Sequence, residues 1–141
     1  MWKAARSWWQ SVVVPPRQRP WYFIIYLLVL GAGIYTLWQP PISIKAEIGP
    51  ALTFVWALLL TVGGALGSIT VLTKFWELER AALGWIFTGA FMYAVVVLMQ
   101  HFTGEGSRIP QLAFITIALV VFAKRYFQIR AWTVQPPYVT D

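Results

Sequence analysis

Long runs of apolar residues, separated by short polar or proline-containing segments, dominate the chain. Four runs lack Asp, Glu, Lys and Arg: residues 21–38, 51–73, 81–101 and 109–123. A helix of about 20 residues crosses a hydrocarbon layer of about 30 Å, so the first three runs are long enough to span a membrane. The fourth becomes long enough if Lys124 and Arg125 extend their charged ends to the interface and the helix continues to about residue 127. The pattern predicts four transmembrane helices, and a re-entrant fourth helix is the alternative.

The segments between these runs support the same division. Two prolines in residues 39–41 end the first helix, and Gly49-Pro50 begins the second. Residues 103–107 form a short polar turn between the third helix and the fourth. Residues 74–80 contain no Gly or Pro and suit a helical turn at the membrane surface. We therefore expect the third helix to begin near Phe75, outside the hydrocarbon.

The overall composition agrees with a membrane protein and excludes several other classes. Apolar residues make up 59% of the 141 residues and charged residues only 11%. Soluble domains are about 45–50% apolar and about 25% charged. These values exclude a cytosolic enzyme, a secreted disulfide scaffold and a disordered chain. Cysteine is absent, so disulfides, thiolate catalysis and Cys-bound metals are excluded as well.

The distribution of Lys and Arg predicts the orientation in the membrane. Nine basic residues fall on the side of the two termini and the middle loop, and only Lys45 and Arg108 fall on the other side. Cytoplasmic segments carry an excess of Lys and Arg, so both termini are predicted to be cytoplasmic in a multi-pass protein of the inner membrane. The basic residues are scattered at helix ends, which argues against nucleic-acid binding. The nine are Lys3, Arg6, Arg17, Arg19, Lys74, Arg80, Lys124, Arg125 and Arg130.

The N-terminal segment has the pattern of an amphipathic helix that lies on a membrane surface. At 100° per residue, its apolar positions fall within an arc of about 140°, and its cationic and polar positions fall opposite. Such a helix is bound by apolar burial and by anionic lipid headgroups. We therefore divide the chain into an interfacial helix with a proline-rich linker (1–20), a four-helix transmembrane domain (21–129) and a cytoplasmic tail (130–141). A frayed basic tail is the alternative for the first segment.

Membrane-interface residues are predicted at the ends of the helices and in the amphipathic segment. An indole ring favours the boundary between hydrocarbon and water, and Lys and Arg reach from a helix end to the headgroups. The predicted set is Trp2, Lys3, Arg6, Trp8, Trp9, Trp21, Trp38, Trp76, Lys124 and Arg125.

The sequence contains no constellation that indicates catalysis or a cofactor. His101 is the single histidine, so no pair of nucleophile and histidine base can form, and a metal site would need three or four ligands. The glycine cluster at residues 63–67 carries no Lys and lies inside a predicted span, unlike a phosphate-binding loop. We expect no catalytic residue, no bound metal and no cofactor, and we do not expect an enzyme.

The second helix has a face of small and hydroxyl-bearing residues that predicts close helix packing. Small residues let two helices approach, and hydroxyls hydrogen-bond across the contact. Gly31 and Gly33 of the first helix, or Ala81, Gly84 and Thr88 of the third, could provide the opposite surface. Packing within one bundle and self-association through the same face are both open. The predicted set is Thr53, Ala57, Thr61, Gly63, Gly64, Gly67 and Ser68.

The architecture of the whole chain resembles the small four-span membrane proteins of actinobacterial phages, some of which are holins. The shared features are the length, four closely spaced spans, basic termini and Trp-rich ends, here carried by Lys3, Arg6, Trp2, Trp8 and Trp9 and by the basic cluster near the C-terminus. The resemblance implies a self-associating protein that permeabilises the membrane. Its partners would then be the lipid bilayer and either further copies or another membrane protein. An accessory subunit of a larger complex is the first alternative, and a small channel or transporter is the second.

Overall fold

In the computed structural model, the described part of the chain forms four long helices joined by short loops. The structure describes residues 18–73, 75–104 and 106–134. The helices are α2 (Arg19–Trp38), α3 (Ile42–Val71), α4 (Trp76–Thr103) and α5 (Ile109–Val134), and no strand occurs in the described part of the chain. All four are long and apolar enough to cross a membrane, which confirms the predicted all-α fold with four helices of spanning length. The predicted N-terminal amphipathic helix lies outside the described residues.

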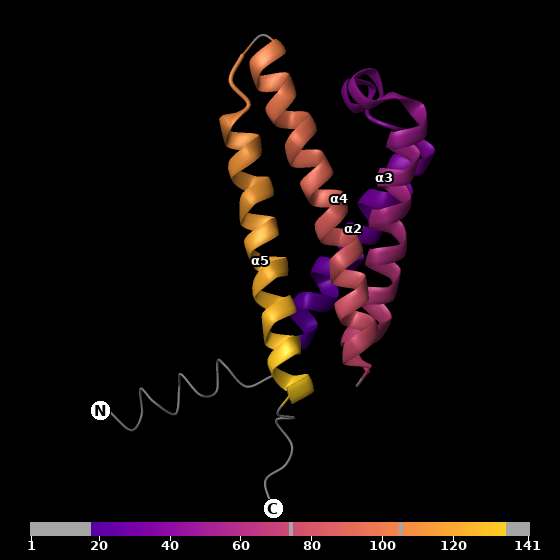
Figure 1. Ribbon diagram of the computed structural model, residues 1–141. Coiled ribbons are helices and arrows are strands. Elements are labelled where there is room, and N and C mark those ends of the chain that lie inside the picture. Colours follow the sequence, from indigo (N-terminus) through magenta and orange to yellow (C-terminus); the bar gives the residue numbers. More distant parts are fainter. Residues whose placement is uncertain (1–17, 74, 105, 135–141) are drawn as a thin grey trace, which may run out of the picture.

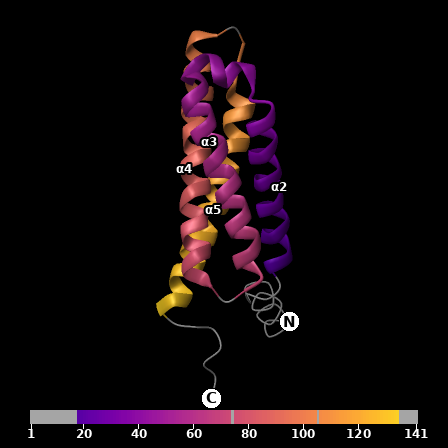
Figure 2. The ribbon, with the colours of Figure 1, turned by 90° about the vertical axis from the view of Figure 1, so that its right-hand side faces the viewer.

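The helices run alternately up and down, so the start of α2 and the end of α5 lie at the same end of the bundle (Figures 1 and 2). Each helix packs mainly on its neighbour in the sequence, because short loops join antiparallel helices side by side. α3 therefore lies between α2 and α4, and α5 packs mainly on α4. This order decides which helix faces meet in the site described below.

The boundaries of α2 and α3 follow from proline and glycine. Pro20 lies in the first turn of α2, where the missing N–H would be unpaired anyway. The N–H of Gln39 closes the last turn on the carbonyl of Tyr35 at 2.7 Å. Pro50 begins the long part of α3, as predicted. The prediction missed a short helical segment before it, at residues 42–48, which is separated from the span by a kink at Gly49 (φ 80°, ψ 168°). Glycine tolerates this positive φ, so the chain turns there without ending the helical pattern.

The third and fourth helices extend beyond the charge-free runs. α4 begins at Trp76, close to the predicted start near Phe75, and carries Glu77 and Glu79 in its first turn, where carboxylates complement the positive end of the helix dipole. α5 continues to Val134, seven residues past the predicted end at 127. The fourth helix therefore reaches a full spanning length with Arg125 well inside it.

Two clusters of buried side chains hold the bundle together, one toward each end. At the end where α2 begins, all four helices contribute to the cluster formed by Tyr22, Tyr26, Val71, Leu83, Ile86, Phe122 and Ile129. At the opposite end, the short segment before Gly49 folds back so that Ile44 packs with Trp56 and Val96. Burying large side chains of this kind stabilises a fold by about 1.5–3 kcal/mol each in water, whereas in lipid the gain comes from close packing.

The outer surface of the bundle is apolar along all four helices. Leu28 (68% exposed), Phe54 (58%), Phe91 (56%) and Phe114 (73%) point outward from α2, α3, α4 and α5. In water, a continuous apolar surface of this size would be a strong aggregation site. In a bilayer it faces lipid chains, so the exposure pattern agrees with the multi-pass arrangement that the helix lengths allow.

Candidate functional site

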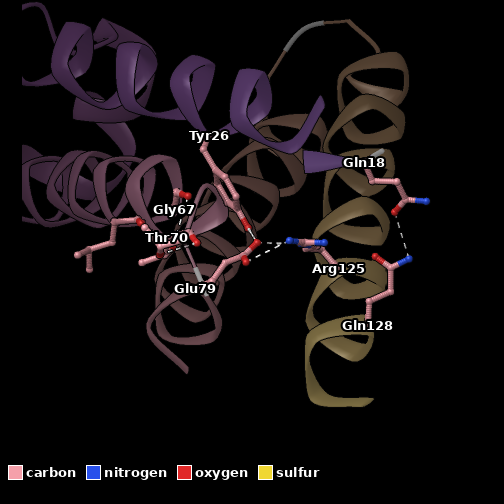
Figure 3. A network of polar contacts seen from close by, with 9 residues as sticks. Gln18, Tyr26, Gly67, Thr70, Glu79, Arg125 and Gln128 are labelled. Carbon is pink, nitrogen blue, oxygen red and sulfur yellow. Dashed lines mark hydrogen bonds and ion pairs between the residues drawn. The ribbon is translucent and has the colours of Figure 1, made fainter. Parts of the chain in front are cut away.

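A buried ion pair joins α4 to α5 near the end of the bundle where α2 begins (Figure 3). Nε of Arg125 lies 2.8 Å from Oε1 of Glu79, and Nη2 lies 3.1 Å from Oε2. This bidentate arrangement, with two parallel N–H···O bonds, is the strongest that a guanidinium and a carboxylate form. The two side chains are only 2% and 1% exposed, so the charges are sealed inside the bundle.

Two tyrosines of α2 complete the surroundings of this ion pair. The hydroxyl of Tyr26 donates a hydrogen bond of 3.0 Å to Oε1 of Glu79. The guanidinium carbon of Arg125 lies 4.6 Å from the centre of the Tyr22 ring, which is a cation–π contact. Tyr22 and Tyr26 are one helical turn apart, so both face the pair from the same side of α2. The cluster of Tyr22, Tyr26, Glu79 and Arg125, called the polar clamp below, thus links three helices.

Gly67 of α3 makes room for this cluster. A Cβ at Gly67 would lie 2.7 Å from Cε1 of the Tyr26 ring, closer than real Cβ atoms approach another side chain. The polar clamp therefore depends on Gly67, a residue of α3 that carries no charge.

A second link between the start of α2 and α5 lies beside the clamp, where Nε2 of Gln128 donates to Oε1 of Gln18 over 3.4 Å (Figure 3).

The structure places the predicted helix-packing residues on the inner side of α3. Six of the seven are buried, and Thr61 is partly buried. Gly64 lies against the backbone of Leu30 in α2, and Gly63 lies against Ile86 and the carbonyl of Ala82 in α4. The hydroxyls of Thr53, Thr61 and Ser68 do not bond across helices but donate to the carbonyl four residues earlier, at 2.7–2.8 Å.

The surfaces of α2 and α4 that pack on α3 differ in part from those predicted from the sequence. Gly33 faces Thr61, since a Cβ on Gly33 would lie 2.5 Å from the Thr61 nitrogen, but Gly31 faces open space. Ala81, Gly84 and Thr88 are exposed and do not face α3. The contact surface of α4 is instead one step around the helix and contains Ala82, Ile86 and Gly89.

Nine of the ten predicted membrane-interface residues fall into three groups. Trp21 (69%) and Trp38 (83%) are exposed at the two ends of α2, and Lys124 is exposed on α5. Trp76 is partly buried against the cluster that contains Tyr22 and Ile129. Five further predicted positions lie outside the described residues: Trp2, Lys3, Arg6, Trp8 and Trp9.

Arg125 is not at the interface, and the prediction for this residue was wrong. It is 1% exposed and bound to Glu79 inside the bundle, whereas the preceding Lys124 points outward. One step along a helix turns the side chain by about 100°, so neighbouring cations can face opposite environments. The helical periodicity of α5 carries a signal for this placement, because Arg125 shares a face with the apolar residues Phe122 and Ile129.

His101 has a structural contact near the loop between α4 and α5. Its Nδ1 accepts a hydrogen bond of 3.3 Å from the backbone N–H of Arg108. Within the described ranges, no group of three or more His, Cys, Asp or Glu side chains lies close enough to hold a metal ion. Among the described residues, the buried charged side chains are Glu79 and Arg125 of the polar clamp.

Comparison of the chain with protein-family models, with curated proteins and with solved structures found no match. The geometry of the bundle itself is the basis for the proposals that follow.

Proposed function

We propose that the protein self-associates in the membrane and permeabilises it, as holins do. The observation that carries this proposal is the separation between an apolar outer surface and an interior that holds glycines, hydroxyls and an ion pair. A membrane lesion has to be lined by polar groups, because water wets such groups and not hydrocarbon. In this bundle those groups face one another, so several copies would have to exchange internal contacts for contacts between chains.

The polar clamp makes such an exchange energetically accessible. Desolvation of a buried ion pair offsets most of the attraction between its charges, so the pair adds little net stability to the closed bundle. In a water-lined assembly Glu79 and Arg125 would regain hydration in place of their contact. The closed and the assembled arrangements would then differ by only a few kcal/mol, which a two-state switch requires.

The test is inducible expression in a bacterium with a dye that reports the membrane potential. We expect the native protein to collapse the potential abruptly after a delay. Glu79→Gln leaves the Arg125 charge buried without its carboxylate and weakens the closed bundle, so the collapse should come earlier at an equal amount of inserted protein. The matched double variant Glu79→Met/Arg125→Met closes the bundle with apolar side chains, and its collapse should be delayed or absent.

A native protein that accumulates in the membrane without depolarising the cell would contradict the proposal. The accessory-subunit alternative would then be favoured, because the glycine face of α3 is already occupied by Leu30, Tyr26 and Ile86 of the same chain. A photo-crosslinker at Phe114, which is 73% exposed on α5, should then capture a different membrane protein and no second copy.

A further inference from the structure

An apolar groove runs between α4 and α5 on the outside of the bundle. Its volume is about 350 Å³, and its floor contains Leu83, Gly84 and Ala123. The floor is low because Gly84 has no side chain, and a Cβ built there meets nothing within 4 Å. This volume is at the lower end of the range of about 300–1,000 Å³ that is typical of small-molecule sites. The rest of the lining is formed by Phe87, Thr88, Phe122, Tyr126 and Phe127.

Two arginines continue the groove at the end where α4 begins and α5 ends. Arg80 precedes Gly84 by four residues and therefore lies on the same face of α4, one turn closer to the helix start. Its guanidinium carbon lies 5.8 Å from the centre of the Tyr126 ring, which itself lines the groove. Arg130 follows Tyr126 by four residues and occupies the equivalent place on α5. Arg80, Arg130 and Lys124 are exposed at this end, and so is the carboxylate of Glu77, one turn before Arg80. Among the described residues, this end of the groove therefore carries three exposed cations against one exposed anion, because the carboxylate of Glu79 is buried against Arg125.

We propose that this groove is a binding site for an anionic phospholipid. One acyl chain lies along the apolar floor between the two helices, and the phosphate lies at the basic end near Arg80 and Arg130. Basic pockets between transmembrane helices recognise anionic headgroups in this way, and the arginine stems cover apolar surface while their charged ends stay hydrated. Under the predicted orientation this end is cytoplasmic, so the lipid comes from the inner leaflet.

The charges favour a lipid over a second copy of this chain. Protomers inserted in the same direction are related by an axis along the membrane normal, so a dimer through this groove would bring like ends together. Arg80, Arg130 and Lys124 would then face the same three cations of the other copy, with the exposed carboxylate of Glu77 in each protomer to offset them. An anionic lipid supplies the opposite charge and the apolar chain at the same time.

The full-length protein, purified in detergent, tests the site by native mass spectrometry with added lipid. We expect retention of one phosphatidylglycerol in preference to phosphatidylcholine with the same acyl chains. Arg80→Gln should weaken retention about fivefold, from about 1 kcal/mol per basic residue near anionic lipid. Gly84→Leu fills the floor of the groove and should abolish retention of the lipid. Thr88→Phe, one helical turn further along α4, should fill the groove as well and have the same effect. Gly31→Leu is the matched control, because Gly31 also faces open space but lies in a groove of α2 whose lining contains no cation.

Three results would overturn the proposal. Equal retention of the two lipids would show that the basic end does not select an anionic headgroup. Unchanged retention in both Gly84→Leu and Thr88→Phe, at native helicity, would show that the acyl chain does not lie in the groove. Complete displacement of the lipid by inorganic phosphate would show that the cations bind phosphate without the groove.

Discussion

Glu79 and Arg125 lie 46 positions apart in the chain and share two hydrogen bonds inside the bundle. A lone charge at this depth would be expensive, since a bilayer offers it no water. The pair is tolerated because each charge neutralises the other and Tyr26 donates a further hydrogen bond to the carboxylate. The geometry thus makes each charge depend on the other, and this dependence can be measured.

The first prediction concerns this dependence and is measured as unfolding in detergent. Glu79→Gln or Arg125→Met alone should lower the free energy of unfolding by about 3–5 kcal/mol, because the remaining group stays buried without its partner. The double variant Glu79→Met/Arg125→Met should be close to the native protein or more stable. Additive losses in the double variant would show that the two side chains do not act as a pair.

At the scale of single helices, α3 is organised by glycines that face different neighbours. Gly64 and Gly67 face α2, while Gly63 faces α4, so one short segment brings three helices close together. Close approach of this kind gives van der Waals contact, the main attraction available between helices in lipid. The glycines are therefore not interchangeable with those that face outward.

The second prediction compares two glycines that lie inside helices. Gly67→Ala places a methyl group against the Tyr26 ring and should destabilise the bundle by about 1–3 kcal/mol through overpacking. Gly31→Ala meets open space and should change stability by less than about 1 kcal/mol. Thermal unfolding of the two variants under the same conditions gives the comparison. Equal effects would mean that helix propensity decides the outcome and that the contact with Tyr26 does not.

At the scale of the whole molecule, the alternation of the four helices brings the start of α2 and the end of α5 to one end of the bundle (Figure 2). The polar clamp and the basic end of the α4–α5 groove are both close to that end. The counts of Lys and Arg, nine against two, predict that this end faces the cytoplasm. The orientation is thus a prediction that combines the alternation with the charge count.

The third prediction tests this orientation with topology reporters. Fusions after Glu47 and after Ser107 should report the outside, and fusions after Thr73 and at the C-terminus should report the cytoplasm. The physical reason is that short basic segments resist transfer across the membrane. A cytoplasmic signal after Glu47 would reverse the arrangement and would place the proposed lipid site in the outer leaflet.

The sequence by itself determined the four helices, their apolar character and the residues where the long part of α3 and the whole of α4 begin. These features are local, because an apolar run of spanning length, a proline or a glycine acts on the chain within a few residues. Even here, the helical segment before Gly49 and the extension of α5 to Val134 were missed. Local signals exist at both places, since Pro40-Pro41 directly precedes the first segment and Pro136-Pro137 follows the end of α5 by two residues. The criterion of charge-free apolar runs did not use them, and in the structure Ile44 packs with Trp56.

Only the tertiary structure decided which side chains meet. The local pattern assigned Arg125 to the membrane surface beside Lys124, but packing of α5 on α4 turned it toward Glu79. The same packing left Gly84 outside, at the floor of the α4–α5 groove, although its small size suggested a place inside the bundle. The periodicity of α5 places Arg125 on one face with Phe122 and Ile129, but it does not identify Glu79 of α4 as the partner. The choice of neighbour depends on contacts between residues far apart in the sequence.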